Sequence, residues 1–433
     1  MNSTNSVGLI CLLLAILLIA IALSGWLKRH WLLSLAASFV LVEFVTINGF
    51  VLVRPLPSLP ASQLQLLSTY VLLPIILADA AYRFRIHDLR YQRLQPMLLL
   101  APVFFISLLF AFLFFLWVFS GQPELDLLII LAASLLIFMA DMFPSHKTLS
   151  ALNSLDKVSS TKTRYTTLIQ VESLLIGALT LMLFLAIGQL TDIDSYTKFK
   201  HSSVTWYWLY WLWAFFGGVV FGFIWGVIGG LIATNIQNYR INLILLSTII
   251  WLSYLSSLYF FDVSGIMALL TTTLIMSKAH TQFLTPREIK YMRALFRNLR
   301  FLVGIVIYSL LIYKLQINVF ISHWFTMIMT VLVFIMARAI SLYGFLPLIL
   351  QLKHHQINAN RQHTLFISTT HSSLILLAVW MLPESTPFRD SYEAMAMALV
   401  LMNLFVQQPN LSRLFQNLLP RKTIRGINLI KNR

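Results

Sequence analysis

Two opposite charges lie within apolar segments that are long enough to cross a membrane. Glu172 stands in the run 165–190 and Arg338 in the run 318–346. An ionised side chain at the centre of a bilayer costs roughly 2.5–3.5 kcal/mol on insertion scales, so it is kept where a partner or a water-filled cavity receives it. Glu172 and Arg338 are therefore predicted to form a buried pair, which either locks two helices together or takes part in transport.

Two aspartates occupy similar surroundings. Asp79 follows an apolar helix that is interrupted by Pro74, and it either pairs with Arg83 one helical turn later or faces a polar cavity. Asp141 ends an apolar stretch and precedes Pro144, which disfavours regular helix at the residue before it. Broken helices line ion sites in transporters, so Asp141 is either an ion ligand or a residue at the headgroup end of its span.

His371 lies among serines and threonines within a predicted span, and it is either a packing residue or a candidate proton relay. Motifs of soluble enzymes are absent, including the phosphate-binding loop, the dinucleotide fingerprint, the zinc-binding histidine pair and the nucleophile elbow. Cys11 is the only cysteine. The sequence thus predicts no enzyme, no cofactor and no metal site.

Composition defines the class of protein that holds these residues. The chain is 59% hydrophobic and 11% charged, and its mean hydropathy is +0.81. A membrane span needs about 20 apolar residues. On this basis the sequence predicts an all-α polytopic membrane protein with about thirteen transmembrane helices, at 7–26, 31–53, 66–84, 96–119, 125–144, 165–190, 205–233, 241–260, 262–277, 296–315, 318–346, 364–382 and 392–407.

The net charge of +16 gives an orientation rather than a nucleic-acid partner. When the loops are assigned alternately to the two sides, most Lys and Arg residues fall on one side. The positive-inside rule then places the N-terminus outside and the C-terminus in the cytoplasm. Anionic lipid headgroups are the expected neighbours of this charge. The basic loops 146–164 and 278–300 are expected to be cytoplasmic connectors, as helices on the membrane surface.

The predicted span 205–233 divides the others into six before it and six after it. Its glycines at 218, 222, 226 and 230 recur every four residues, a pattern typical of close helix packing. Two six-helix halves with broken helices at the centre suggest inverted repeats, as in many secondary transporters.

Several segments resemble the sodium/proton antiporters of the cation:proton antiporter superfamily, in its NhaP/NHE branch. Leu72-Leu-Pro-Ile-Ile-Leu-Ala-Asp79-Ala-Ala is similar to the family's LLPPILFEAA helix, with Asp79 in place of Glu. Arg164-Tyr-Thr-Thr-Leu-Ile-Gln-Val-Glu172-Ser173-Leu-Leu resembles RLRTLIEGESLL. Val263-Ser-Gly-Ile-Met-Ala268 resembles VSGVLA, and Met336-Ala-Arg338-Ala resembles the ARA helix with its buried arginine. The order of these matches along the chain makes the resemblance specific.

The resemblance implies an ion site, and it shows where this chain departs from the family. The family's cation-binding aspartate follows ESLL, where this chain has Ile176 and Gly177. The ion ligands implied here are Asp79, Asp141 and Ser173. A different alignment of the broken helix would place Ser145, with His146 beside it, at the position expected of Asp141. The late arginine of the family is replaced near His371, whereas the Glu172–Arg338 pair, structural in the family, is kept.

The sequence therefore favours a secondary antiporter that exchanges a monovalent cation, Na⁺ or similar, for protons. The alternative is an exchanger-fold membrane protein that has lost exchange and acts in binding or regulation, or carries another solute. Residues 1–415 would form the transmembrane domain and 416–433 a short basic cytoplasmic tail. The resemblance implies a homodimer. We expect the protein in a bacterial inner membrane, with membrane lipids as further partners and no nucleic-acid partner.

Overall fold

The computed structural model describes residues 61–84, 95–119, 127–139, 169–170, 172–191, 204–235, 239–283, 286–314, 317–347, 362–363, 366, 373–403 and 406. The regular elements in these ranges are all helical. They are α3 (Ala61–Leu67), η1 (Ser68–Leu72), α4 (Leu73–Arg83), α6 (Gln95–Val118), α7 (Leu127–Ile137), η2 (Glu172–Ile176), α10 (Gly177–Thr191), α12 (Val204–Asn235), α13 (Tyr239–Phe260), α14 (Gly265–Phe283), α15 (Pro286–Lys314), α16 (Ile317–Ala339), η3 (Ile340–Phe345), α19 (Ser373–Trp380) and α20 (Arg389–Met402). The η elements are π-helical segments.

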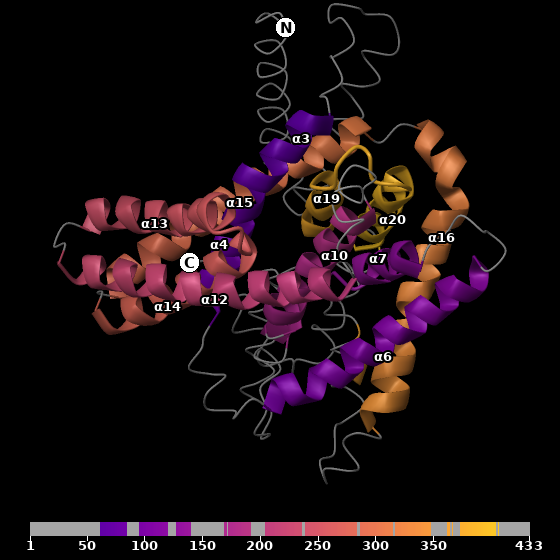
Figure 1. Cartoon of the computed structure of the whole chain (residues 1–433), viewed down its shortest axis with the longest axis horizontal. Coiled ribbons are helices and arrows are strands. Elements are labelled where there is room, and N and C mark those ends of the chain that lie inside the picture. The colour runs from indigo at the N-terminus through magenta and orange to yellow at the C-terminus, as the bar shows by residue number, and fades with distance from the viewer. Residues whose placement is uncertain are drawn as a thin grey trace, which may run out of the picture.

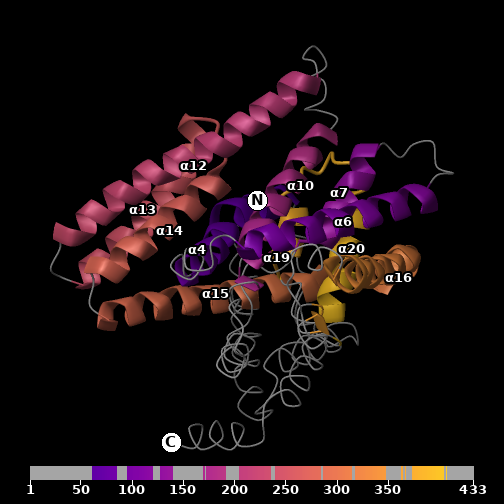
Figure 2. The same cartoon turned by 90° about the horizontal axis from the view of Figure 1, so that it is seen from below.

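The helices form two groups joined by a central one. Helices α12, α13 and α14 lie together on one side of the molecule, and α6, α7, α16 and α20 lie on the other (Figures 1 and 2). Between them, α4 packs against both α14 and α15. This arrangement places Asp79, which is on α4, at the junction of the two groups.

The predicted spans from 66–84 onward each contain helix in the structure, whereas the first two, 7–26 and 31–53, lie outside the described residues. Within the described part of the chain, four helical stretches have the length and hydropathy needed to cross a membrane: Ser62–Arg83, Ala101–Val118, Leu209–Ile232 and Ser322–Phe345. Shorter apolar helices accompany them. The all-α membrane class is thus confirmed.

The outer surface of α6 is apolar. Phe105, Leu109, Leu113 and Trp117 recur every four residues along one face, and each is more than half exposed. A stripe of large exposed apolar side chains of this length faces hydrocarbon in a membrane protein, because water would make it an aggregation site. The surface therefore supports the membrane assignment independently of helix length.

The helix that carries Asp79 is continuous through Pro74, contrary to the interruption expected from the sequence. The π-helical segment η1 ends at Leu72, and Pro74 stands in the first turn of α4. Proline has no backbone N–H group, and this is tolerated in the first turn of a helical segment. The widened π-helical turn before Pro74 makes room for its ring. Ser62–Arg83 can consequently serve as a single span.

The basic segment 278–300 is not a separate connector. Helix α14 continues to Phe283, and α15 starts at Pro286 and runs to Lys314, so residues 286–300 form the first half of a long helix. The connector is helical, as expected, and the helix that contains the predicted span 296–315 begins earlier, at Pro286. Apolar residues such as Met292 and Phe296 lie among the basic ones and are buried, which extends the packed face into this half.

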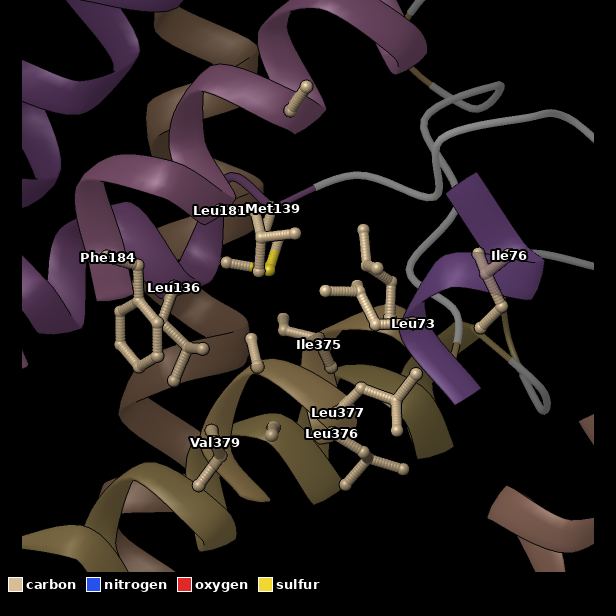
Figure 3. Packing of buried hydrophobic residues seen from close by; sticks show 14 of the residues in the cluster. Leu73, Ile76, Leu136, Met139, Leu181, Phe184, Ile375, Leu376, Leu377 and Val379 are labelled. Carbon is tan, nitrogen blue, oxygen red and sulfur yellow. The ribbon is translucent and has the colours of Figure 1, made fainter. Parts of the chain in front are cut away.

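The buried core lies where α4, α7, α10 and α19 meet. Figure 3 shows Leu73 of α4, Leu136 of α7, Phe184 of α10 and Ile375 of α19 in this cluster. Leu374 to Trp380 of α19 have no exposed surface at all. A helix that is apolar all round must be surrounded by other helices, so α19 is the centre of this half of the molecule.

The glycine stripe of α12 packs closely against another helix, as the sequence predicts, and that helix is α14. A Cβ atom at Gly218 would lie 2.5 Å from the carbonyl oxygen of Ser264, and one at Gly226 would lie 2.8 Å from Cβ of Ile275. At Gly222 the obstacles are the Ala268 carbonyl oxygen and the Thr271 hydroxyl. Close approach of backbones through small residues is the usual source of helix association in membranes.

Replacement of Gly222 by alanine is expected to destabilise the protein by about 1–3 kcal/mol, because the new methyl group must push two backbones apart. The matched control is Gly304→Ala in α15, where no atom lies within 4 Å of the added Cβ. The control should leave stability unchanged or raise it slightly, since alanine favours helix. Unfolding in detergent mixtures measures both, and equal stability of the two variants would contradict the packing argument.

Candidate functional site

Asp79 is a fully buried carboxylate held by two arginines. Its side chain has no exposed surface, and Nη2 of Arg83 lies 2.5 Å from its Oδ1. On the other side, Nη1 of Arg300 donates a hydrogen bond of 3.2 Å to Oδ2. The pairing with Arg83 expected from the sequence is therefore present, and Asp79 is also buried within the bundle.

The surroundings of Asp79 come from three helices. Tyr82, three residues further along α4, packs against Phe296 of α15 with ring centroids 5.5 Å apart. The hydroxyl group of Ser277, on α14, donates a hydrogen bond of 3.2 Å to the carbonyl oxygen of Tyr82. These contacts fix the end of α4 between α14 and α15, which brings Arg300 to Asp79.

Sequence reasoning missed Arg300 as a partner of Asp79. The residue was assigned to a basic connector, where its charge served only to orient the chain. One signal was available: Arg293, Arg297 and Arg300 are spaced by four and three residues, as expected for one face of a helix. That face continues into the predicted span 296–315, so a membrane helix with a basic stripe at its end could have been inferred.

The predicted pair of Glu172 and Arg338 is present. Nη2 of Arg338 lies 2.5 Å from Oε1 of Glu172, and the two side chains are 4% and 9% exposed. Both partners adjoin π-helical turns, since Glu172 begins η2 and Arg338 precedes η3 by two residues. Widened turns of this kind commonly occur at functional positions in helices. Here they lie next to the two residues that form the buried ion pair between helices.

A hydroxyl pair adjoins this ion pair. The side chain of Ser341, in η3, donates to the carbonyl oxygen of Arg338 over 3.1 Å. Oγ of Ser107, on α6, lies 2.6 Å from Oγ of Ser341. All three residues are buried. The Glu172–Arg338 contact is thus tied to a third helix by polar contacts, as expected of a structural lock in a low-dielectric interior.

Ser173 is buried beside Glu172, but its hydroxyl group bonds within its own helix. It donates to the carbonyl oxygen of Ile169 over 2.5 Å. No hydrogen bond joins the described side chains of Ser173 and Asp79, and their elements make separate sets of polar contacts. In this structure the two implied ion ligands are therefore not joined by a direct contact.

Near the position at which the resemblance implies an aspartate, the polar side chain is the hydroxyl group of Thr180. Ile176 ends η2 and Gly177 begins α10. The hydroxyl group of Thr180, one turn later, is buried and lies 2.8 Å and 2.9 Å from the carbonyl oxygens of Ile176 and Gly177. Thr180 was not among the candidate residues predicted from the sequence. Its hydroxyl group hydrogen-bonds to the backbone carbonyl oxygens of this turn.

The remaining predicted site residues, Asp141, Ser145, His146 and His371, lie outside the described residues. Helix α7 ends at Ile137, before Asp141, and the N–H groups of Phe138 and Met139 close its last turn. Among the described residues, no group of three or more His, Cys, Asp or Glu side chains could hold a metal ion.

The segment Val263-Ser-Gly joins α13 to α14. The N–H group of Ser264 donates to the carbonyl oxygen of Ala214 on α12 over 3.0 Å, and α14 begins at the next residue, Gly265. A Cβ atom at Gly265 would lie 2.9 Å from Cγ of Leu258. The glycine in this motif therefore permits a close approach between α13 and α14.

The helices, their apolar outer surface and the buried ion pairs define a polytopic helical membrane protein with charged groups inside its bundle. The sequence model of the transmembrane sodium/hydrogen exchanger family matches residues 15–416. Because this match spans nearly the whole sequence, the chain belongs to the sodium/hydrogen exchanger family. The predicted membership of the cation:proton antiporters is thereby confirmed.

Solved structures share the fold. The chain is similar to the sodium proton antiporter MjNhaP1 from Methanocaldococcus jannaschii at pH 8, with a TM-score of 0.70 and 15% sequence identity over 96% of this chain and 99% of that chain. A structure of MjNhaP1 from an electron-microscopy map gives a TM-score of 0.66 and 15% identity over 97% and 99%. No curated protein sequence matches the chain.

Proposed function

We propose that this protein exchanges a monovalent cation for protons across a membrane. The observation that carries the proposal is the family match over residues 15–416, together with a fully buried carboxylate, Asp79, on a helix long enough to cross the bilayer. A family of exchangers needs a group for which cation and proton compete, and an enclosed carboxylate is such a group. Na⁺ is the expected cation, since hard cations prefer oxygen ligands.

The two arginines set a condition on how Asp79 could act. As long as both guanidinium groups contact it, the negative charge of the carboxylate is compensated, which weakens its attraction for a cation. The contact with Arg300 is the longer of the two, at 3.2 Å against 2.5 Å. Exchange at Asp79 would therefore require Arg300 to withdraw, and movement of α15 against α4 would provide this. Alternating access by relative movement of helix groups is common among secondary transporters.

The remaining ligands of the proposed site are Ser173 and Asp141, with Ser145 and His146 as the alternatives and His371 as the proton relay. Glu172 and Arg338 would hold the bundle together without taking part in exchange. The proposed orientation puts the N-terminus outside and the C-terminus in the cytoplasm, because of the charge distribution in the loops. The proposed assembly is a homodimer.

A second candidate function is supported by Ile176 and Gly177. These residues stand where the resemblance implies the cation-binding aspartate. The hydroxyl group of Thr180 donates its hydrogen bond to the carbonyl oxygens of the same turn. A chain that lacks the cation-binding aspartate, and whose Asp79 forms ion pairs with two arginines, could retain the fold as a binding or regulatory protein.

Proton flux in vesicles separates the two candidates. The purified protein, reconstituted with an imposed pH gradient, should alkalinise the acidic interior when Na⁺, Li⁺ or K⁺ is added outside, as measured with a pH-sensitive dye. Proton movement with one or more of these cations is the expected result. If none of them moves protons beyond the rate in protein-free vesicles, the exchange proposal fails and the binding function is favoured.

Substitution of Ser173 tests the proposed ligand set. Ser173→Ala should raise the cation concentration for half-maximal flux about five- to tenfold, since one oxygen ligand is lost. Ser134→Ala is the matched control, because Ser134 is also buried and its hydroxyl also donates to a carbonyl oxygen four residues earlier, over 2.8 Å. Equal half-maximal concentrations for the two variants would remove Ser173 from the site.

A further inference from the structure

Three arginines follow one edge of α15. Arg293, Arg297 and Arg300 are separated by four and three residues, so they lie on the same side of the helix. Arg300 bonds Asp79 of α4, and Phe296, between the arginines, packs against Tyr82 of the same helix. Figure 2 shows α15 as a long helix that runs past α4. The arginine edge is therefore fixed at the end of α4 where Arg83 lies.

Positive charge at this place exceeds negative charge. Arg83 is close enough to Arg297 and Arg300 to be repelled by both, and Asp79 is the carboxylate that attracts it. Among the described side chains, Arg83, Arg297 and Arg300 thus lie near one carboxylate, and Arg293 lies near Tyr82 at the same end of α4. Like charges at the edge of a membrane domain repel strongly, because the low-dielectric interior screens them poorly. An anion that binds there would relieve this repulsion.

The arginines that do not contact Asp79 are open to a ligand. Arg293 and Arg297 are both exposed, whereas Arg83 and Arg300 are 16% and 22% exposed. A guanidinium group donates two parallel hydrogen bonds to a phosphate, which makes arginine the preferred side chain for that group. The exposed pair supplies the donors, and the half-buried pair supplies additional positive charge behind them.

An exposed apolar side chain continues this edge. Phe301 lies one helical turn after Arg297, on the same side of α15, and is 47% exposed. The buried face of α15, formed by Met292, Phe296 and Val303, lies on the other side of the arginines. The edge thus separates the packed face from a face that meets hydrocarbon, at the level where α15 changes from basic to apolar sequence. A ligand with both a phosphate and an acyl chain fits this combination.

We propose that Arg293 and Arg297, supported by Arg83 and Arg300, bind the headgroup phosphate of an anionic phospholipid, whose acyl chain lies along Phe301. Basic groups between membrane helices, next to exposed apolar surface, are typical of lipid headgroup sites. The proposal commits to a lipid rather than to free phosphate because of the apolar face beside the arginines. It does not depend on whether the protein exchanges cations.

Native mass spectrometry of the purified full-length protein tests the site. In detergent, dioleoyl phosphatidylglycerol should bind more tightly than dioleoyl phosphatidylcholine, and millimolar inorganic phosphate should not displace it. Arg297→Gln should weaken phosphatidylglycerol binding about fivefold, and Arg293→Gln combined with Arg297→Gln at least about tenfold. Arg297→Lys, which keeps the charge and loses the paired hydrogen bonds, should fall between Arg297→Gln and the unchanged protein.

The control is Arg240→Gln, which removes the same charge from α13 and should leave lipid binding unchanged. Thermal unfolding in detergent without added lipid checks that each variant is folded, and the lysine variant serves if Arg297→Gln is not. Three results would overturn the proposal: equal loss of lipid binding in Arg240→Gln and Arg297→Gln, equal affinity for the two lipids, or displacement by inorganic phosphate. The last result would identify a site for free anions.

Discussion

Replacement of Asp79 by asparagine is expected to reduce cation-dependent proton flux to the level of protein-free vesicles. The substitution keeps the size of the side chain and removes the only charge on it that could bind a cation. It also leaves Arg83 and Arg300 facing a neutral group in a site with no exposed carboxylate surface. Flux per amount of folded protein, measured in reconstituted vesicles, is the relevant quantity.

Loss of the carboxylate should also lower stability, by about 1–3 kcal/mol, because two half-buried guanidinium groups lose their counter-charge. Two further variants separate this effect from transport. Asp79→Glu keeps the charge, so it should fold and retain exchange. Asp79→Asn combined with Arg300→Gln removes one charge of each sign, so it should recover part of the stability but none of the flux.

An Asp79→Asn variant that is folded and transports normally would contradict a role for this carboxylate in exchange. Flux that persists in Asp79→Ala combined with Asp141→Ala would exclude the whole proposed site. Normal stability of Asp79→Asn, by contrast, would contradict only the argument from the two arginines. The two claims about Asp79 can therefore fail separately.

Replacement of Arg338 by alanine is expected to destabilise the protein by about 3–5 kcal/mol, since Glu172 would remain buried without a partner. The free energy of unfolding in detergent mixtures measures this change. Glu172→Gln should have a smaller effect in the same direction, because a neutral amide can still accept hydrogen bonds from the guanidinium group.

The double variant Glu172→Gln with Arg338→Ala is the informative one. It leaves no unpaired charge, so its loss of stability should be smaller than the sum for the two single variants, by about 1–3 kcal/mol. A smaller loss than for Arg338→Ala alone would show that the pair is not needed for the net stability of the bundle. Strict additivity of the two single changes would mean that the contact contributes no coupling energy.

The buried pair of Glu172 and Arg338 could be predicted from the sequence. Each of the two residues interrupts an apolar run, and an unpaired charge in such a run is too costly to keep. The partner of Asp79 could be predicted only in part. Arg83 is four residues away on the same helix, and helix geometry alone brings the two together.

Arg300 is 221 residues away from Asp79 in the sequence, and no local pattern connects them. Their contact depends on how α15 packs against α4, which Phe296 and Tyr82 determine through their ring contact. The start of α15 at Pro286 could not be predicted for a related reason. Basic residues at 287–300 suggested a surface connector, but the apolar residues between them pack against the bundle and extend the helix.

The sequence by itself determined the membrane class, the segments from 66 onward that contain helix, the close packing of the glycine stripe and the family. Each follows from hydrophobic length, from periodicity along one helix or from ordered motifs, which are properties of the chain alone. Only the tertiary structure decided which helices face each other: α14 against the glycines of α12, Arg300 against Asp79, and Ser173 bonded within its own helix. Contacts between distant segments depend on the fit of whole helix faces, and a single sequence does not contain that fit in any local pattern.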